Sequence, residues 1–184
     1  LGGILEASES LLELINDILD LASIEAGYLT LERGKFDVHS MIASVFSLNR
    51  ERARLKELKL TLECPPTIGT IEADERRLKQ VLFNLVGNAL NFHSDGEPPQ
   101  VEIAAYEPDS DSVAGLVVRD RGPGIAAEHQ ERVFQLFQRA VGRKVEGTGA
   151  GLAIVRQISN RYGGEAWYEP RSGGGSEFTI TFQK

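Results

Sequence analysis

Residues 84–91 read Asn-Leu-Val-Gly-Asn-Ala-Leu-Asn, and the fold assignment starts from this stretch. Asn84, Asn88 and Asn91 are spaced four and three residues apart, so on a helix their amides project from one face. Asparagine is a middling helix former, so three of them on one stripe among leucines and valines need a reason. Amide oxygens suit Mg²⁺ or hydrogen bonds with a nucleotide. Amides that are merely satisfied against a loop would give the same pattern.

A second polar segment, Asp120-Arg-Gly-Pro-Gly-Ile125, directly follows an apolar strand predicted over residues 115–118. A carboxylate at a strand end can accept a hydrogen bond from an exocyclic amine, and Gly122 and Gly124 let the backbone approach a ligand. An Asp-x-Gly turn also occurs in structural loops, so this segment alone leaves both interpretations open.

A third segment, Gly147-Thr148-Gly149-Ala150-Gly151-Leu152, leads into a predicted helix. Glycines let backbone amides face a phosphate, and the positive end of a helix dipole favours an anion there. The order Gly-x-Gly-x-Gly differs from the dinucleotide-binding fingerprint, and the Gly-Lys-Ser/Thr ending of a P-loop is absent.

Residues 134–147 connect these two segments and carry a short cationic loop. Phe134 and Phe137 come first, followed by Arg139, Arg143 and Lys144 in a chain whose net charge is -7. These cations would neutralise a polyphosphate or form a mobile lid. A solvated run of charges is the alternative.

The periodicity of the whole chain predicts a two-layer α/β sandwich with a mixed sheet, preceded by a long N-terminal helix. Asp37 and Asp74 are predicted to cap two of the helices. Predicted helices cover residues 1–26, 38–48, 75–92, 126–137 and 151–162, and predicted strands cover residues 59–63, 70–72, 101–106, 113–119, 165–168 and 177–182.

The apolar stripe of residues 1–26 repeats at heptad spacing, is broader than a two-stranded seam, and suits a four-helix bundle. Because so short a helix is marginal alone, we expect it to associate with helices outside this segment. Folding back on its own domain is the alternative. Gly27 is the expected C-cap.

Composition excludes several classes of function. The 27 acidic against 20 basic residues argue against nucleic-acid binding, for which a basic face would be expected. It has no run of eighteen apolar residues and no basic start, so we expect no membrane contact and no signal peptide in this segment. The lone Cys64 favours a reducing compartment, and we expect the segment to be cytoplasmic.

In order and spacing, the four segments resemble the N, G1, F and G2 boxes of sensor histidine kinases, members of the GHKL ATPase superfamily. The resemblance covers nearly the whole chain. Residues 10–38, which include the apolar stretch 11–27, are similar to the second helix of the dimerisation and phosphotransfer hairpin. The resemblance implies that residues 1–33 belong to this hairpin and that residues 34–184 form the catalytic ATP-binding domain.

The resemblance further implies a Bergerat-type ATP site. Asp120 would accept the adenine amino group, and Asn88 would ligate a Mg²⁺ that bridges the phosphates. Gly122, Gly124 and Ile125 would shape the base pocket, and Thr179 would join a water network beneath the adenine. Asn84 and Asn91 would lie near the metal. The phosphates would be lined by Gly147, Thr148, Gly149, Gly151 and Leu152, and the lid would carry Arg143 and Lys144.

By the same resemblance, the γ-phosphoryl group of MgATP would pass to a histidine and then to an aspartate of a response regulator receiver domain. The protein would be a homodimer through its N-terminal helical bundle. The histidines of this chain are His39, His93 and His129, and none precedes the bundle helix. The phosphoacceptor is therefore expected upstream of this segment.

Departures from the family pattern concern the nucleotide. Asn91 stands where many members carry Lys or Arg, and the lid between Phe137 and Gly147 is short, so a degenerate homologue acting as a scaffold is an alternative.

Hydrolytic branches of the superfamily place a glutamate where Asn84 stands, and an amide cannot take a proton from water. We therefore expect ATP binding with slow hydrolysis. A stand-alone serine kinase of the anti-sigma type is disfavoured by residues 10–38.

Overall fold

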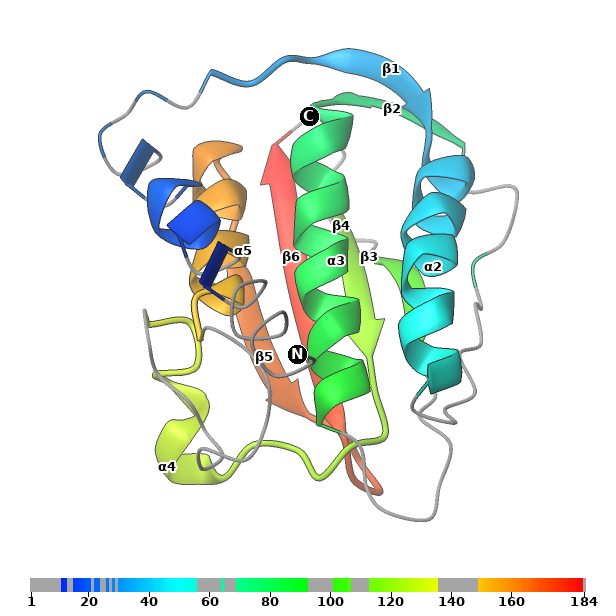
Figure 1. The fold of residues 1–184 in the computed structure, drawn as a ribbon, viewed down its shortest axis with the longest axis vertical. Helices are drawn as coiled ribbons and strands as arrows, with labels where there is room; N and C mark the ends of the chain where they lie inside the picture. Colours follow the sequence, from blue (N-terminus) through cyan, green and yellow to red (C-terminus); the bar gives the residue numbers. More distant parts are fainter. Residues whose placement is uncertain are drawn as a thin grey trace, which may run out of the picture.

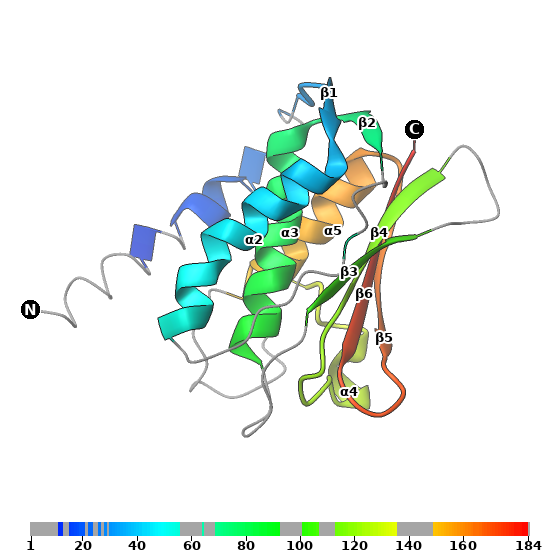
Figure 2. The ribbon, with the colours of Figure 1, turned by 90° about the vertical axis from the view of Figure 1, so that its right-hand side faces the viewer.

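Three helices cover one face of a four-stranded sheet in the computed structural model of the chain (Figure 1). The view turned by 90° separates the two layers, with the helices on one side and the strands on the other (Figure 2). The helices are α2 (Val38–Leu55), α3 (Glu75–Asn91) and α5 (Gly151–Arg161). The structure describes residues 11–12, 15–20, 22–23, 26, 28, 30–55, 64, 69–92, 101–106, 113–135 and 149–183.

The sheet has the order β3-β4-β6-β5, and every pairing among its described strands is antiparallel. The expected two layers are confirmed, and among the described strands the sheet is antiparallel rather than mixed. β4 and β5 run in the same direction, yet β6 lies between them and pairs antiparallel with both. The strands are β3 (Glu102–Tyr106), β4 (Val113–Arg119), β5 (Ala166–Pro170) and β6 (Ser176–Gln183).

A second, two-stranded sheet joins β1 (Gly34–Asp37) to β2 (Thr70–Ala73). The strand β2 was expected. The strand β1 was not, because its sequence Gly-Lys-Phe-Asp adjoins a polar stretch and has little apolar alternation. Its partner lies more than thirty residues away along the chain, so a local pattern does not reveal the pairing.

Both predicted helix caps are confirmed. Asp37 Oδ1 accepts a hydrogen bond from the Ser40 amide at 2.7 Å, and Asp74 Oδ1 accepts one from the Arg77 amide at 3.1 Å. The apolar side of α3 fills the centre of the core: Leu78, Val81, Leu82, Leu85, Val86 and Ala89 are each at most 3% exposed. The fold thereby holds α3 rigidly against the sheet.

The described parts of the N-terminal segment are helical at residues 11–12, 15–20 and 22–23. Their apolar side chains stay outside the core: Leu11, Leu12, Ile15, Ile18 and Leu19 are 41–61% exposed. The helix does touch the domain through Asp20, which accepts hydrogen bonds from Arg77 and Gln80 on α3. Of the rest of the predicted helix over residues 1–26, only Ala26 is described, as a turn whose amide donates to the Ala22 carbonyl at 2.9 Å. The expected cap Gly27 lies outside the described residues.

The helix predicted over residues 126–137 is much shorter than expected. Only α4 (Ala127–Gln130) is helical, and turns follow up to residue 135. Ala126 offers no side-chain cap, and the side-chain Nε2 of Gln130 donates to the Ile125 carbonyl at 2.8 Å. The strand predicted over residues 59–63 lies outside the described residues. None of the helices in the described ranges is long and apolar enough to cross a membrane.

Candidate functional site

Asp120 directly follows β4, and its side chain is buried in a fixed orientation. Its Oδ1 accepts hydrogen bonds from the backbone amides of Gly122, at 2.7 Å, and Ser176, at 3.1 Å. The Asp120 amide in turn donates to the Ser176 carbonyl at 2.9 Å. Two chain segments that are far apart in sequence therefore hold one carboxylate oxygen.

Burial raises the pKa of Asp120 above its ordinary value of 3.8. The hydrogen bonds from Gly122 and Ser176 and the positive charge of Arg171 act in the opposite direction and do not cancel the effect of burial. The carboxylate therefore lies in a poorly solvated place, where a hydrogen bond to a ligand is stronger than it would be in water.

The glycines after Asp120 are required by close packing. A Cβ atom on Gly122 would lie 2.1 Å from the carbonyl oxygen of Phe92, at the end of α3. Gly124 has a φ of +71°, and a Cβ atom there would lie 3.2 Å from the Gly175 carbonyl. The sequence predicted that these glycines let the backbone approach a ligand. In the structure they let this loop approach α3 and the β5–β6 turn.

Ile125 closes the same loop. Its amide donates to the Tyr168 hydroxyl at 3.1 Å, and its side chain packs against the core. Tyr168 itself contacts Phe178, with ring centroids 5.4 Å apart. The loop from Asp120 to Ile125 is thus anchored at both ends.

The asparagine stripe of α3 meets the glycine-rich start of α5. Asn84 Nδ2 donates to the Gly151 carbonyl at 3.1 Å, and Gly149 just before α5 has a φ of +75°. The amide nitrogen of Asn84 is therefore satisfied by the first residue of α5, so this amide has a structural contact in the fold. Leu152 packs partly against the core.

Asn88 lies one helical turn beyond Asn84 and is half-buried. Its side-chain amide makes no hydrogen bond with any residue in the described ranges. Its amide oxygen is a hard ligand that fits Mg²⁺. Asn91 is also half-buried and already takes part in an interaction within the structure.

Thr179 is not brought to Asp120. On β6 the side chains alternate between faces, and Phe178 and Ile180 belong to the core beneath the helices. Thr179 therefore lies on the opposite face of the sheet, paired with Val117 and Trp167. The residue beside Asp120 is Ser176, which sequence reasoning missed and which only the β4–β6 register identifies.

The lid residues Arg143, Lys144, Gly147 and Thr148 lie outside the described residues, as does Phe137. Phe134, the first of the two phenylalanines, is buried and packs edge-on against Phe178 with ring centroids 6.3 Å apart. The guanidinium of Arg156 on α5 lies 5.7 Å from the centre of the Phe134 ring. Phe134 is thus held in the core at the start of the segment for which the sequence predicts a lid.

Comparison with known proteins identifies similar chains. The family described as histidine kinase-, DNA gyrase B-, and HSP90-like ATPase matches residues 73–184. The histidine protein kinase DivJ from Caulobacter vibrioides is 37% identical over 177 residues, which are 95% of this chain and 29% of DivJ. This chain therefore spans less than a third of the length of that relative.

Solved structures with the same fold include full-length ShkA in complex with AMPPNP, with a TM-score of 0.82 and 32% identity over 96% of this chain and 36% of ShkA. The histidine kinase ThkA in complex with the response regulator TrrA has a TM-score of 0.73 and 28% identity, covering 98% of this chain and 49% of ThkA. Both matches cover nearly all of this chain.

Proposed function

This chain belongs to the family of histidine kinase-, DNA gyrase B- and HSP90-like ATPases, as the ATP-binding catalytic domain of a sensor histidine kinase, and we propose that it transfers the γ-phosphoryl group of ATP to a histidine. The acceptor histidine would lie on the helix that pairs with the N-terminal segment in a hairpin. From there the phosphoryl group would pass to an aspartate of a response regulator receiver domain.

One observation carries the proposal: α3 touches both glycine-rich segments. Asn84 contacts Gly151 at the start of α5, and the Phe92 carbonyl contacts Gly122 in the loop after β4. Eight residues of helix separate these contacts, a span of about 12 Å. Asn88 lies between them, so a base recognised near Asp120 and phosphates near α5 would meet the same helix.

Base recognition falls to the Asp120 carboxylate. Two backbone amides already occupy Oδ1, and an ionised carboxylate has further acceptor sites for the amino group of adenine. A base that carries a carbonyl oxygen in that place would leave the buried carboxylate unpaired, which is costly. The domain should therefore prefer adenine nucleotides.

The phosphate end rests on Asn88 and on the start of α5. Asn88 would hold Mg²⁺ through its amide oxygen, and the bound ion would offset the phosphate charge. Gly149, Gly151 and Leu152 would present backbone to the phosphates, and the dipole of α5 favours an anion at this end. Arg143, Lys144, Gly147 and Thr148 would complete the site from the lid.

Asn84 determines the fate of the phosphoryl group. An amide cannot act as a general base, so nothing at this position activates water. The chain would hold ATP with little hydrolysis until the histidine is positioned for transfer. Strong intrinsic ATPase activity would contradict this assignment.

The partners follow from the exposed helix and from the similar structures. Leu11, Leu12, Ile15, Ile18 and Leu19 would be covered in a helical bundle formed by a homodimer. The complex of ThkA with TrrA supports a response regulator as the second partner. We place the domain in the cytoplasm, where ATP is available.

Calorimetric titration with MgATP tests the binding step, with Asp120→Asn as the control. A longer chain that includes the hairpin histidine, incubated with γ-labelled ATP, tests the transfer step. Binding together with label on the histidine supports the proposal. Binding without label would instead identify a regulatory scaffold that has lost the kinase reaction, and failure of the wild type to bind ATP would contradict both.

A further inference from the structure

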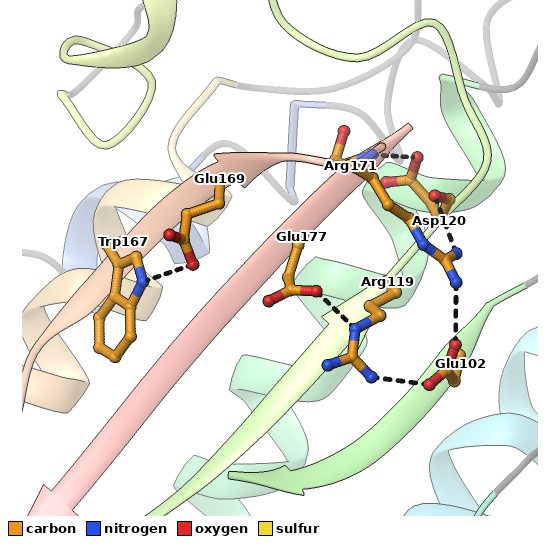
Figure 3. A network of polar contacts seen from close by, with 8 residues as sticks. Glu102, Arg119, Asp120, Trp167, Glu169, Arg171 and Glu177 are labelled. Carbon is orange, nitrogen blue, oxygen red and sulfur yellow. Dashed lines mark hydrogen bonds and ion pairs between the residues drawn. The ribbon is translucent and has the colours of Figure 1, made fainter. Parts of the chain in front are cut away.

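The face of the sheet opposite the helices carries an ion-pair network that ends at Asp120 (Figure 3). Glu102 on β3, Arg119 on β4 and Glu177 on β6 lie directly opposite one another in the sheet register. Arg119 Nη1 lies 2.7 Å from Glu102 Oε1, and its Nε lies 2.5 Å from Glu177 Oε2. Opposite charges at such cross-strand positions stabilise a sheet.

Arg171 connects the row of Glu102, Arg119 and Glu177 to Asp120. Its Nη2 donates to the second carboxylate oxygen of Glu102 at 3.1 Å. Its Nη1 points at the backbone carbonyl of Asp120, at the long hydrogen-bond distance of 3.5 Å. All four side chains of the network are 22–30% exposed, so they are only partly screened by water.

The backbone of Arg171 also closes the turn that holds Asp120. The Gly174 amide donates to the Arg171 carbonyl at 3.1 Å, and the Arg171 amide donates to the Gly175 carbonyl at 3.3 Å. Gly175 lies so close to Asp120 that a Cβ atom there would be 2.1 Å from its carbonyl oxygen. The next residue, Ser176, supplies one of the two amides on the Asp120 carboxylate.

We propose that Arg171 is a positioning residue that, by joining Glu102 to the Asp120 backbone, fixes the Asp120 carboxylate and sets the preference of the site for adenine. This inference rests on the proposed function. The Arg171 guanidinium has two roles, since its fork bridges two acceptors and its charge favours the ionised form of Asp120. The Arg119 side chain contacts Glu102 and Glu177. Within the network it is linked to Asp120 through Glu102 and Arg171.

The test compares ATP with inosine triphosphate, which has a carbonyl oxygen where adenine has its amino group. Arg171→Gln removes the charge and the bridge. We expect it to weaken ATP binding about three- to tenfold and to leave inosine triphosphate binding unchanged. The ATP-to-inosine-triphosphate preference, measured by calorimetry, should fall by the same factor.

Arg54→Gln is the matched control. It removes the same charge from an exposed pair with Glu51, at 2.7 Å on α2, far from Asp120 in the fold. We expect the base preference of this variant to equal that of the wild type. Arg171→Lys keeps the charge without the planar fork and should recover only part of the preference.

The outcomes separate the inference from the proposed function. If the wild type binds ATP and Arg171→Gln keeps the full base preference, the inference is overturned and the proposed function stands. If both nucleotides lose affinity by the same factor, Arg171 has only a structural role and the inference again fails. If the wild type binds neither nucleotide, the proposed function itself is wrong, and the inference falls with it.

Discussion

The base end and the phosphate end of the candidate site are held in different ways. At the base end, Asp120 is fixed by backbone amides from two segments and by the turn that carries Arg171. At the phosphate end, the Asn88 amide has no hydrogen-bond partner within the described part of the chain. On the proposed function, the acceptor for the base is therefore pre-positioned by the fold, whereas the Asn88 amide would take its contact from the ligand.

Among the tests of this difference, Asp120→Asn should produce the largest effect. The asparagine oxygen can still accept from Gly122 and Ser176, but its amide nitrogen would face the adenine amino group as a second donor. We expect ATP affinity to fall roughly 100-fold or more, because a required acceptor is lost. Calorimetry measures the affinity, and the thermal midpoint should stay close to that of the wild type. Wild-type ATP binding by this variant would refute the role of Asp120.

Gly122→Ala tests the packing of the base end. The added Cβ atom would lie 2.1 Å from the Phe92 carbonyl oxygen, so the loop or the end of α3 must move. We expect a loss of about 1–3 kcal/mol in the free energy of unfolding, measured by urea denaturation.

Gly87→Ala, within α3, is the control for Gly122→Ala. A Cβ atom on Gly87 meets nothing within 4 Å, and alanine is the better helix former. This variant should gain about 0.5–1 kcal/mol. Equal destabilisation by the two variants would contradict the close approach at Gly122.

Asn88→Ala tests the phosphate end. Loss of a single amide ligand should weaken MgATP binding about tenfold, as charge-assisted contacts of this size allow. Binding of ATP in the presence of a chelator should be unchanged, since the lost contact is to the metal. An equal loss with and without Mg²⁺ would show that Asn88 acts on the nucleotide or on the fold.

The smallest effect concerns the dependence of stability on pH. Burial raises the pKa of Asp120 in the folded state above 3.8, so the folded protein binds this proton more tightly than the unfolded chain. The contribution of this group to stability is greatest below pH 3.8 and falls as pH rises through its folded pKa. Relative to Asp120→Asn, the wild type should lose stability as pH rises through that window. A wild type that gains stability relative to Asp120→Asn as pH rises would contradict the effect of burial.

Local sequence patterns predicted the elements that depend on near neighbours. The caps at Asp37 and Asp74 use amides three residues away, and the apolar period of α3 gives its buried side directly. Of the helix predicted over residues 126–137, only α4 is helical in the described part, and turns follow it. The periodic pattern alone therefore overestimated the length of this helix.

Contacts between residues far apart in the chain could not be predicted from the sequence. Ser176 reaches Asp120 across 56 residues, and Arg171 reaches Glu102 across 69. Thr179 was assigned from the family resemblance, but the alternation of β6 places it on the other face. The register of a sheet decides such cases, and it is set by pairings that a single strand does not encode.

A crystal structure of this chain with AMPPNP and Mg²⁺ tests the central claim most directly. The account predicts the adenine amino group within hydrogen-bond distance of the Asp120 carboxylate and the metal on the Asn88 amide oxygen. A nucleotide bound elsewhere, or a metal held without Asn88 while Asp120 faces no base, would contradict it.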